Sequence, residues 1–283
     1  MRFGWQFFAK ISSFTAIFLL FTSNANARVY GEKFCNTPGF HCIKVKGVVK
    51  NGVALKSETW ESLWPDSRER DIVKKLNRLH NWLFPGTTLA VPDDMNGKTH
   101  MDFSPFPKRL EDFSARVLNL LGAVPMPYYI ESLGVSYKPI PQLKEKLYIF
   151  NPALLAWAVY DASDKLINWG PGLGGKDYCP DIDKKCRTPS GIFEAMAKHG
   201  YNYRSNLYPP GCTGEECSWM PYAIKVREDG LSMHGAKWFI GHHASHGCVR
   251  LFTADAKWLN QKFVDIKTKE KNGTKVIFLP YPK

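Results

Sequence analysis

Long apolar runs are almost absent from this chain of 283 residues. The one run, at residues 11–21, is shorter than the roughly 20 residues that a membrane helix needs. The sequence also has no internal repeat, no low-complexity segment and no concentrated run of Lys and Arg. These absences argue against a membrane-spanning domain, a repeat fold and a nucleic-acid-binding tract.

The N-terminus has the pattern of a secretory signal peptide. Arg2 and Lys10 place positive charge around the start of the apolar run, and residues 25–27 form a small-x-small cleavage site. We therefore predict a signal peptide at residues 1–27 and a mature protein in the periplasm, where disulfides persist. The alternative is an uncleaved N-terminal anchor.

Export also bears on the charge of the protein. Removing Arg2 and Lys10 lowers the formal charge from +12 to +10. This excess favours an anionic partner such as a cell-wall polymer, and we expect no nucleic-acid partner in an exported protein. A diffuse basic surface without a specific ligand is the alternative.

Seven cysteines leave one without an obvious partner, Cys248. The other six form three close couples, namely Cys35/Cys42, Cys179/Cys186 and Cys212/Cys217. Six cysteines allow 15 connectivities, so the sequence leaves their pairing open. An odd cysteine in an exported protein indicates either an intermolecular bridge or a reactive free thiol.

Neighbouring histidines favour the reactive thiol. His246 lies two residues before Cys248, and His234 lies on a separate predicted strand. Because a thiol near pKa 8.5 is only a few per cent ionised at pH 7, a histidine that acts as base or cation raises its nucleophilicity. The backbone N–H groups of Gly247 and Cys248 would stabilise an oxyanion.

Cys248 also allows two other interpretations. A lone cysteine is often a small buried apolar residue. A zinc site could combine it with the nearby histidines His234, His242, His243 and His246. However, adjacent histidines on a strand diverge and no second free cysteine exists, so we expect neither a metal nor another cofactor.

Short β-type segments dominate the second half of the chain. Residues 156–160, 166–169 and 276–279 read as strands, and residues 223–226 and 235–241 add β-type sequence. Residues 254–263 have a helical pattern, with Thr253 as the expected cap. The glycines of residues 170–175 are not followed by a helical pattern, so they indicate a corner of the sheet and not a phosphate-binding loop.

Three motifs in this half occur in order: TPSGIF at 188–193, MHG at 233–235 and SHGCVRL at 245–251. Together they resemble the catalytic signature of the L,D-transpeptidases of the YkuD type, over about residues 146–280. The resemblance implies a mainly β catalytic domain at residues 146–283, an antiparallel sandwich or barrel. Two features depart from the family pattern. One is the short spacing from His234 to Ser245, and the other is a cysteine-bearing insertion, which carries Cys179, Cys186, Cys212 and Cys217.

The resemblance also implies roles for individual residues. Cys248 would be the nucleophile, and His234 the general base, held by a backbone carbonyl. His246 would shape the site or polarise the thiol, and Gly247 would help to form the oxyanion hole. The predicted substrate-binding residues are Arg250, Ser245 and Gly235, with Arg250 suited either to a substrate carboxylate or to a structural ion pair.

The implied reaction is acyl transfer through a thioester. Cys248 would attack the meso-diaminopimelate carbonyl of a peptidoglycan tetrapeptide stem and release D-alanine. The acyl acceptor stays open: the amine of a second stem would give a 3→3 crosslink, water would make the enzyme an L,D-carboxypeptidase, and a protein lysine would anchor a lipoprotein. Carbapenems are the expected inhibitors.

The first half of the mature chain suggests a small α+β module. Residues 41–92 resemble a LysM module, which binds N-acetylglucosamine-containing glycans, although residues 57–59 read Ser-Glu-Thr where Gly-Asp-Thr is common. A small packing domain is the alternative. Residues 93–145, rich in proline, are predicted to be a connector with one helix over 110–121.

The sequence is also compatible with two competing functions. A non-catalytic wall-binding protein would use the LysM-like unit, but an inert relative is expected to lose Cys248 or His234, and both are present. A generic cysteine peptidase lacks its usual local signatures.

Overall fold

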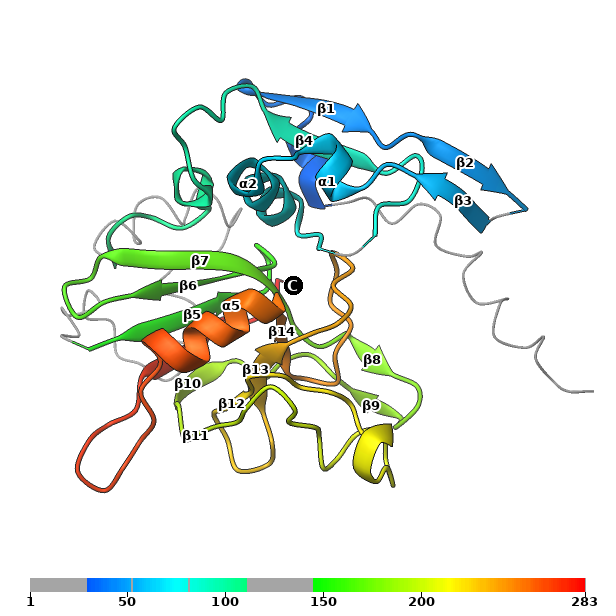
Figure 1. Cartoon of the computed structure of the whole chain (residues 1–283). Coiled ribbons are helices and arrows are strands. Elements are labelled where there is room, and N and C mark those ends of the chain that lie inside the picture. Colours follow the sequence, from blue (N-terminus) through cyan, green and yellow to red (C-terminus); the bar gives the residue numbers. More distant parts are fainter. Residues whose placement is uncertain (1–29, 52, 81, 111–144, 283) are drawn as a thin grey trace, which may run out of the picture.

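The computed structural model describes residues 30–51, 53–80, 82–110 and 145–282, and within them two units follow one another along the chain (Figure 1). The predicted signal peptide lies outside the described residues, as does the predicted connector helix from residue 111 onward. No helix in the described ranges is long and apolar enough to cross a membrane.

The first unit combines a two-stranded antiparallel sheet, formed by β1 and β4, with two helices and a hairpin. Its elements in chain order are η1 (Tyr30–Phe34), β1 (Phe40–Lys44), β2 (Gly47–Lys50), β3 (Val53–Ser57), α1 (Trp60–Leu63), α2 (Ser67–Asn77) and β4 (Thr88–Pro92). The LysM resemblance itself stays a prediction.

Helix α2 is fixed at both ends and holds this unit together. The Asp66 carboxylate accepts two backbone N–H bonds at the start of the helix, and Arg78 closes it in the left-handed region at φ 56°. The buried Asn77 amide donates to the carbonyls of Val73 and Ala90 at 2.8 Å and accepts from the Ala90 N–H at 2.9 Å. All the polar atoms of this amide are thus satisfied while it joins α2 to β4.

The second unit contains, within the described residues, one nine-stranded sheet of order β10-β15-β5-β6-β7-β14-β13-β12-β11. The strands are β5 (Leu147–Asn151), β6 (Ala156–Tyr160), β7 (Leu166–Leu173), β10 (Gly191–Glu194), β11 (Ala197–Lys198), β12 (Ile224–Lys225), β13 (Ser232–Gly235), β14 (Val249–Leu251) and β15 (Lys275–Phe278). Strand β15 runs parallel to β5, and β13 runs parallel to β14. The mainly β fold predicted for this domain is therefore confirmed, but the sheet is mixed and not purely antiparallel.

Both faces of the central strands are buried. In β5, Leu147 and Ile149 point into one core with Phe106 and Leu110, whereas Tyr148 and Phe150 belong to the opposite core. This arrangement explains why the strand is apolar at almost every position and not only at alternate ones.

Helix α5 (Thr253–Trp258) and the π-helical turn η5 (Leu259–Phe263) pack in the same core as Tyr148 and Phe150. There they contact strands from both halves of the sheet, so the sheet curls around them (Figure 1). The helix predicted at 254–263 is confirmed. However, Phe252 occupies the cap position and makes no side-chain cap bond. Residues 236–241, which we expected to be β-type, form a loop after β13.

Smaller elements lie between these parts. They are η2 (His100–Phe103), β8 (Tyr178–Cys179), β9 (Lys184–Lys185) and η4 (Gly214–Glu216). Strands β8 and β9 form a short hairpin in the cysteine-bearing insertion.

The two units dock through the C-terminal end of α2. The buried Arg78 side chain donates from Nε to the carbonyl of Leu154 at 3.1 Å, and its guanidinium lies 4.9 Å from the ring centre of Trp169. Lys75 and Asp255, both nearly inaccessible, form an ion pair of 3.5 Å between α2 and α5. These contacts are buried, so they fix the first unit on the second.

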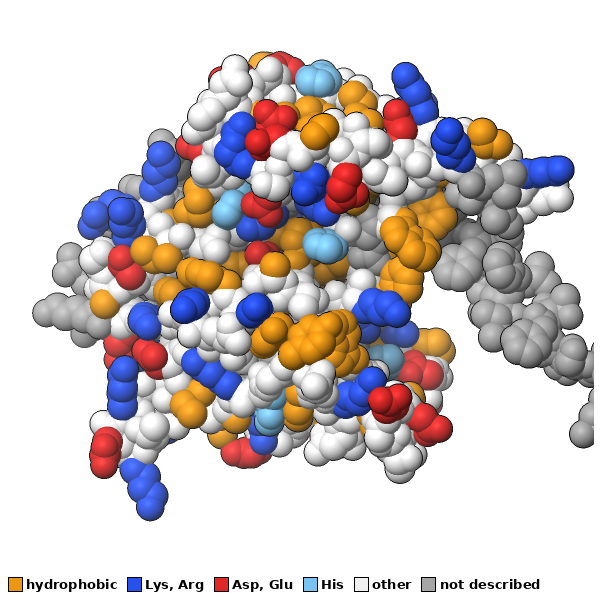
Figure 2. Space-filling view, in the orientation of Figure 1, with side chains coloured by type: hydrophobic (Ala, Val, Ile, Leu, Met, Phe, Trp, Pro, Cys, Tyr) orange, Lys and Arg blue, Asp and Glu red, His pale blue; other side chains and the backbone are white. Residues whose placement is uncertain are grey.

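Exposed aromatic residues gather beside this junction. The indole rings of Trp82 and Trp238 meet edge to face, with centroids 5.7 Å apart, and their side chains are 79% and 51% exposed. Phe84 and Ile240 are exposed nearby in sequence, and Ile240 forms a β-bridge with Leu79. Figure 2 shows hydrophobic side chains on the surface where the two units meet.

Candidate active site

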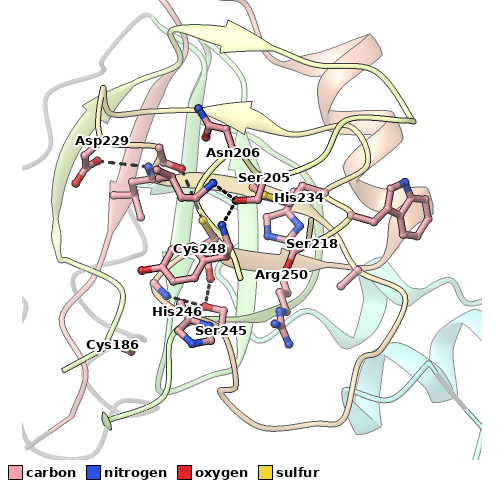
Figure 3. A pocket seen from close by; sticks show the side chains of 18 of the residues that line it. Cys186, Ser205, Asn206, Ser218, Asp229, His234, Ser245, His246, Cys248 and Arg250 are labelled. Atoms are coloured by element: carbon pink, nitrogen blue, oxygen red, sulfur yellow. Dashed lines mark hydrogen bonds between the residues drawn. The ribbon is translucent and has the colours of Figure 1, made fainter. Parts of the chain in front are cut away.

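The parallel pairing of β13 with β14 brings the two main motifs together. His234 lies opposite Arg250 in the register, and Cys248 directly precedes β14. Because side chains two residues apart on a strand share a face, Cys248, Arg250 and His234 all project to the same side. Figure 3 shows them around one pocket.

Cys248 is the free cysteine that the sequence predicts. The other six form the disulfides Cys35–Cys42, Cys179–Cys186 and Cys212–Cys217, which settles the open connectivity in favour of nearest neighbours. The thiol donates to the Gly230 carbonyl at 3.8 Å. Burial raises the pKa of Cys248, while the backbone of Ser232 and the positive charge of Arg250 act in the opposite direction. Cys248 is therefore a thiol at neutral pH.

His234 has one nitrogen available to take that proton. Its Nδ1 donates to the Gly235 carbonyl at 2.7 Å, because a carbonyl can only accept. Nε2 therefore carries the lone pair. Burial lowers the pKa of His234 to about 4, and the nearby Arg250 adds to this effect, so the imidazole is neutral at pH 7.

The turn before Cys248 is held by Ser245. Its buried hydroxyl donates to the Cys248 carbonyl at 2.5 Å and accepts from the Gly247 N–H at 3.1 Å. Gly247 has a φ of 124°, which disfavours any residue with a side chain. Ser245 therefore braces the turn, and the Gly247 amide is bonded to the Ser245 hydroxyl. Both residues line the pocket, and their predicted roles toward substrate and oxyanion stay predictions.

Gly235 differs from its predicted role. It does not line the pocket, and a Cβ atom there would lie 3.0 Å from both Pro221 Cγ and Thr253 Cα. Its carbonyl holds His234. Gly235 thus permits close packing against α5 and orients the histidine, and it is not placed to bind substrate.

His246 lies at the pocket wall and is held from the insertion. Its Nε2 donates to Asp181 Oδ2 at 2.6 Å, and its ring stacks on Tyr208 with centroids 4.8 Å apart. The bond from His246 lowers the pKa of Asp181, so this partner is a carboxylate. Sequence reasoning missed Asp181 and Tyr208, since the cysteines of the insertion were the only signal and no spacing rule connects them to His246.

The histidines near Cys248 do not fit the alternative of a zinc site. His243 uses both ring nitrogens, accepting from the Gly174 N–H at 2.9 Å and donating to the Pro152 carbonyl at 3.2 Å. His242 lies outside the pocket lining. The group with metal-ligand spacing in the described residues is Cys179, Asp181 and His246, but the sulfur of Cys179 is in a disulfide.

The pocket is a cavity of about 710 Å³ with a strongly basic wall. Its basic residues are Lys184, Lys185, Arg187, Arg227, Lys237 and Arg250. Among the described lining residues the one acid is Asp229, and it is neutralised by Arg227 through bonds of 2.6 and 2.7 Å. Arg250 has no acidic partner within the described ranges, and both of its predicted roles stay predictions.

Comparison with known families identifies the second unit. Residues 151–277 match a profile of the YkuD family, described as the L,D-transpeptidase catalytic domain. This segment contains the MHG and SHGCVRL motifs and is similar to the L,D-transpeptidase catalytic domain. No curated protein matches the chain.

Solved structures give weaker likenesses. An L,D-transpeptidase from Mycobacterium smegmatis is 23% identical over 47% of this chain and 58% of its own, with a TM-score of 0.37. One from Xylanimonas cellulosilytica is 16% identical over 62% and 99%, with a TM-score of 0.39. Mycobacterium tuberculosis L,D-transpeptidase 3, solved with a faropenem-derived adduct, is 18% identical over 47% and 60%, with a TM-score of 0.35. The chain thus spans 58% of the length of the Mycobacterium smegmatis protein.

The neutral buried imidazoles predict a pH-dependent stability. His234 and His243 both have a pKa lowered to about 4 by burial, whereas an unfolded histidine titrates near pH 6.5. The unfolded chain therefore binds more protons between these values, so stability is full above pH 6.5 and falls as the pH drops toward 4. Each histidine contributes a slope of about 1.4 kcal/mol per pH unit.

Urea unfolding between pH 7 and 4.5 measures this slope. His243→Gln is expected to make it shallower, and His242→Gln, at an exposed position, is the matched control. Equal slopes in wild type and H243Q would contradict a neutral buried imidazole at position 243.

Proposed function

We propose that this protein is an exported peptidoglycan L,D-transpeptidase with Cys248 as nucleophile. The observation that carries the proposal is that a free thiol and a neutral histidine with an unprotonated Nε2 both line one basic cavity of the matched domain. Export rests on the predicted signal peptide and is supported by the three disulfides.

The first half-reaction forms a thioester. His234 Nε2 takes the Cys248 proton as sulfur attacks the carbonyl between meso-diaminopimelate and D-alanine in a tetrapeptide stem. With the Gly247 amide bonded to Ser245, the oxyanion role falls to the Cys248 amide. The C–N bond then breaks, and the proton on His234 passes to the leaving D-alanine amine.

The second half-reaction returns the free enzyme. An amine attacks the thioester carbonyl, the C–S bond breaks, and the proton of the amine reaches Cys248 through His234. With a second stem as acceptor the product is a 3→3 crosslink. Water would give L,D-carboxypeptidase activity, and a lipoprotein lysine would give an anchored protein.

Carbapenem acylation tests the nucleophile and base. Incubation with imipenem is expected to add one drug mass to the intact protein and none to Cys248→Ala. His234→Ala should slow acylation by about 100-fold or more, the usual size of a general-base contribution. Wild-type protein that stays unmodified, or an adduct that persists in C248A, would count against the mechanism.

Arg250 is proposed to bind a stem carboxylate, because its guanidinium lines the cavity and has no acidic partner in the described residues. Arg250→Gln should lower kcat/KM on a tetrapeptide stem by about 10- to 100-fold, the range for a hydrogen bond to a charged group. The control is the same stem with its carboxylates amidated, on which wild type and R250Q should act alike. An equal loss on both substrates would assign Arg250 a structural role.

The first unit is proposed to contact the glycan of the same wall polymer. This rests on the LysM resemblance of residues 41–92 and on the exposed indole of Trp82, which meets the pocket-lining Trp238. An aromatic ring face suits the apolar face of a sugar ring and leaves its hydroxyl groups in water.

Sedimentation with purified peptidoglycan tests this contact. Trp82→Ala should weaken binding by about tenfold, as loss of an interface aromatic does. Ile266→Ala, an exposed apolar residue in the segment after η5, serves as the matched control. If W82A and I266A bind like wild type, the indole does not contact glycan.

A further inference from the structure

The cysteine-bearing insertion is attached to the nucleophile turn at two places. At its base, Gly175 forms a β-bridge with Ser245, and the Lys176 N–H donates to the Ser245 carbonyl at 3.1 Å. At its tip, Asp181 accepts from His246 at 2.6 Å. Both contacts fall within three residues of Cys248.

A disulfide closes the hairpin that presents Asp181. Cys179 and Cys186 are bonded across the β8–β9 hairpin, and Asp181 lies in the turn between its strands. The Cys179 sulfur, a carboxylate oxygen of Asp181 and a ring nitrogen of His246 lie within 4.8 Å of one another. The Cys179–Cys186 disulfide therefore lies next to the Asp181–His246 pair.

The carboxylate determines which nitrogen of His246 carries the proton. Because a carboxylate only accepts, Nε2 is the protonated nitrogen, and Tyr208 stacked on the ring limits its rotation. Lys176, 3.8 Å from Asp181, keeps a positive charge beside the carboxylate. The position of the proton on His246 and the orientation of its ring are therefore both set by contacts with the insertion.

We propose that Asp181 is a positioning residue of the acyl-transfer site, held by the Cys179–Cys186 disulfide so that it fixes His246 and, through it, the turn that carries Cys248. The effect of Asp181 on acyl transfer rests on the proposed function. The placement of His246 itself does not.

Histidine-ring NMR tests the pair directly. In wild type the His246 ring is expected to show a protonated Nε2 with the shift of a carboxylate-bound imidazole. Asp181→Asn should move that signal and Asp181→Ala should move it further, while the His234 signal stays. An unchanged His246 signal in D181A would overturn the proposal, whether or not the protein is a transpeptidase.

Acylation kinetics test the consequence. Asp181→Ala is expected to slow imipenem acylation of Cys248 by about tenfold or more, since misplacement by 1 Å can cost 10²-fold. Asp181→Glu, which keeps the carboxylate, should restore part of the rate. Asp181 is exposed, so its variants are expected to fold, and thermal melting checks this.

A double-mutant cycle tests the disulfide. Replacing both Cys179 and Cys186 by Ala should slow acylation as D181A does, and adding D181A should cause little further loss because both act through one contact. Replacing Cys35 and Cys42, in the first unit, is the matched control and should leave the rate unchanged. Effects that simply add, or a D181A rate within twofold of wild type, would overturn the proposal. If wild type does not react with imipenem, the proposed function is contradicted instead. The NMR experiment then still tests whether Asp181 holds His246.

Discussion

The parallel pairing of β13 with β14 is the constraint on which the geometry of the candidate active site depends. In this register His234 lies opposite Arg250, and Cys248 shares their face. A parallel pair cannot be joined by a tight turn, so a connection of about a dozen residues must cross from the end of one strand to the start of the next. Residues 236–248 are that connection, and they also supply pocket-lining residues such as Trp238 and His246.

The two histidines of the site owe their different properties to what surrounds each ring. His234 is buried beside a carbonyl and near Arg250, which lowers its pKa and leaves a neutral imidazole to accept a proton. His246 is bound to the carboxylate of Asp181 at the pocket wall. Because the pKa of Cys248 is raised and that of His234 is lowered, the site holds a neutral cysteine and a neutral histidine and not a preformed ion pair.

The sequence predicted the elements better than their arrangement. Apolar periodicity placed β6, β15 and α5, and the odd cysteine located Cys248, because these signals are local. The direction of β13 relative to β14 is a tertiary property and was missed. The contact of the Ser245 hydroxyl with its own turn and the close packing of Gly235 were also missed, because a motif shows which residues occur together but not which atoms they contact.

The docking of the first unit has a consequence for this geometry. The parallel connection is a loop, and loops usually have the lowest local stability in a fold. Here Ile240 in that loop pairs with Leu79, and Trp238 packs on Trp82. The Leu79 end of this contact is itself fixed, because the neighbouring Arg78 is buried against Leu154. The first unit therefore braces one wall of the cavity while the disulfide-closed hairpin braces another, so that the segment carrying His246 and Cys248 is restrained from both sides.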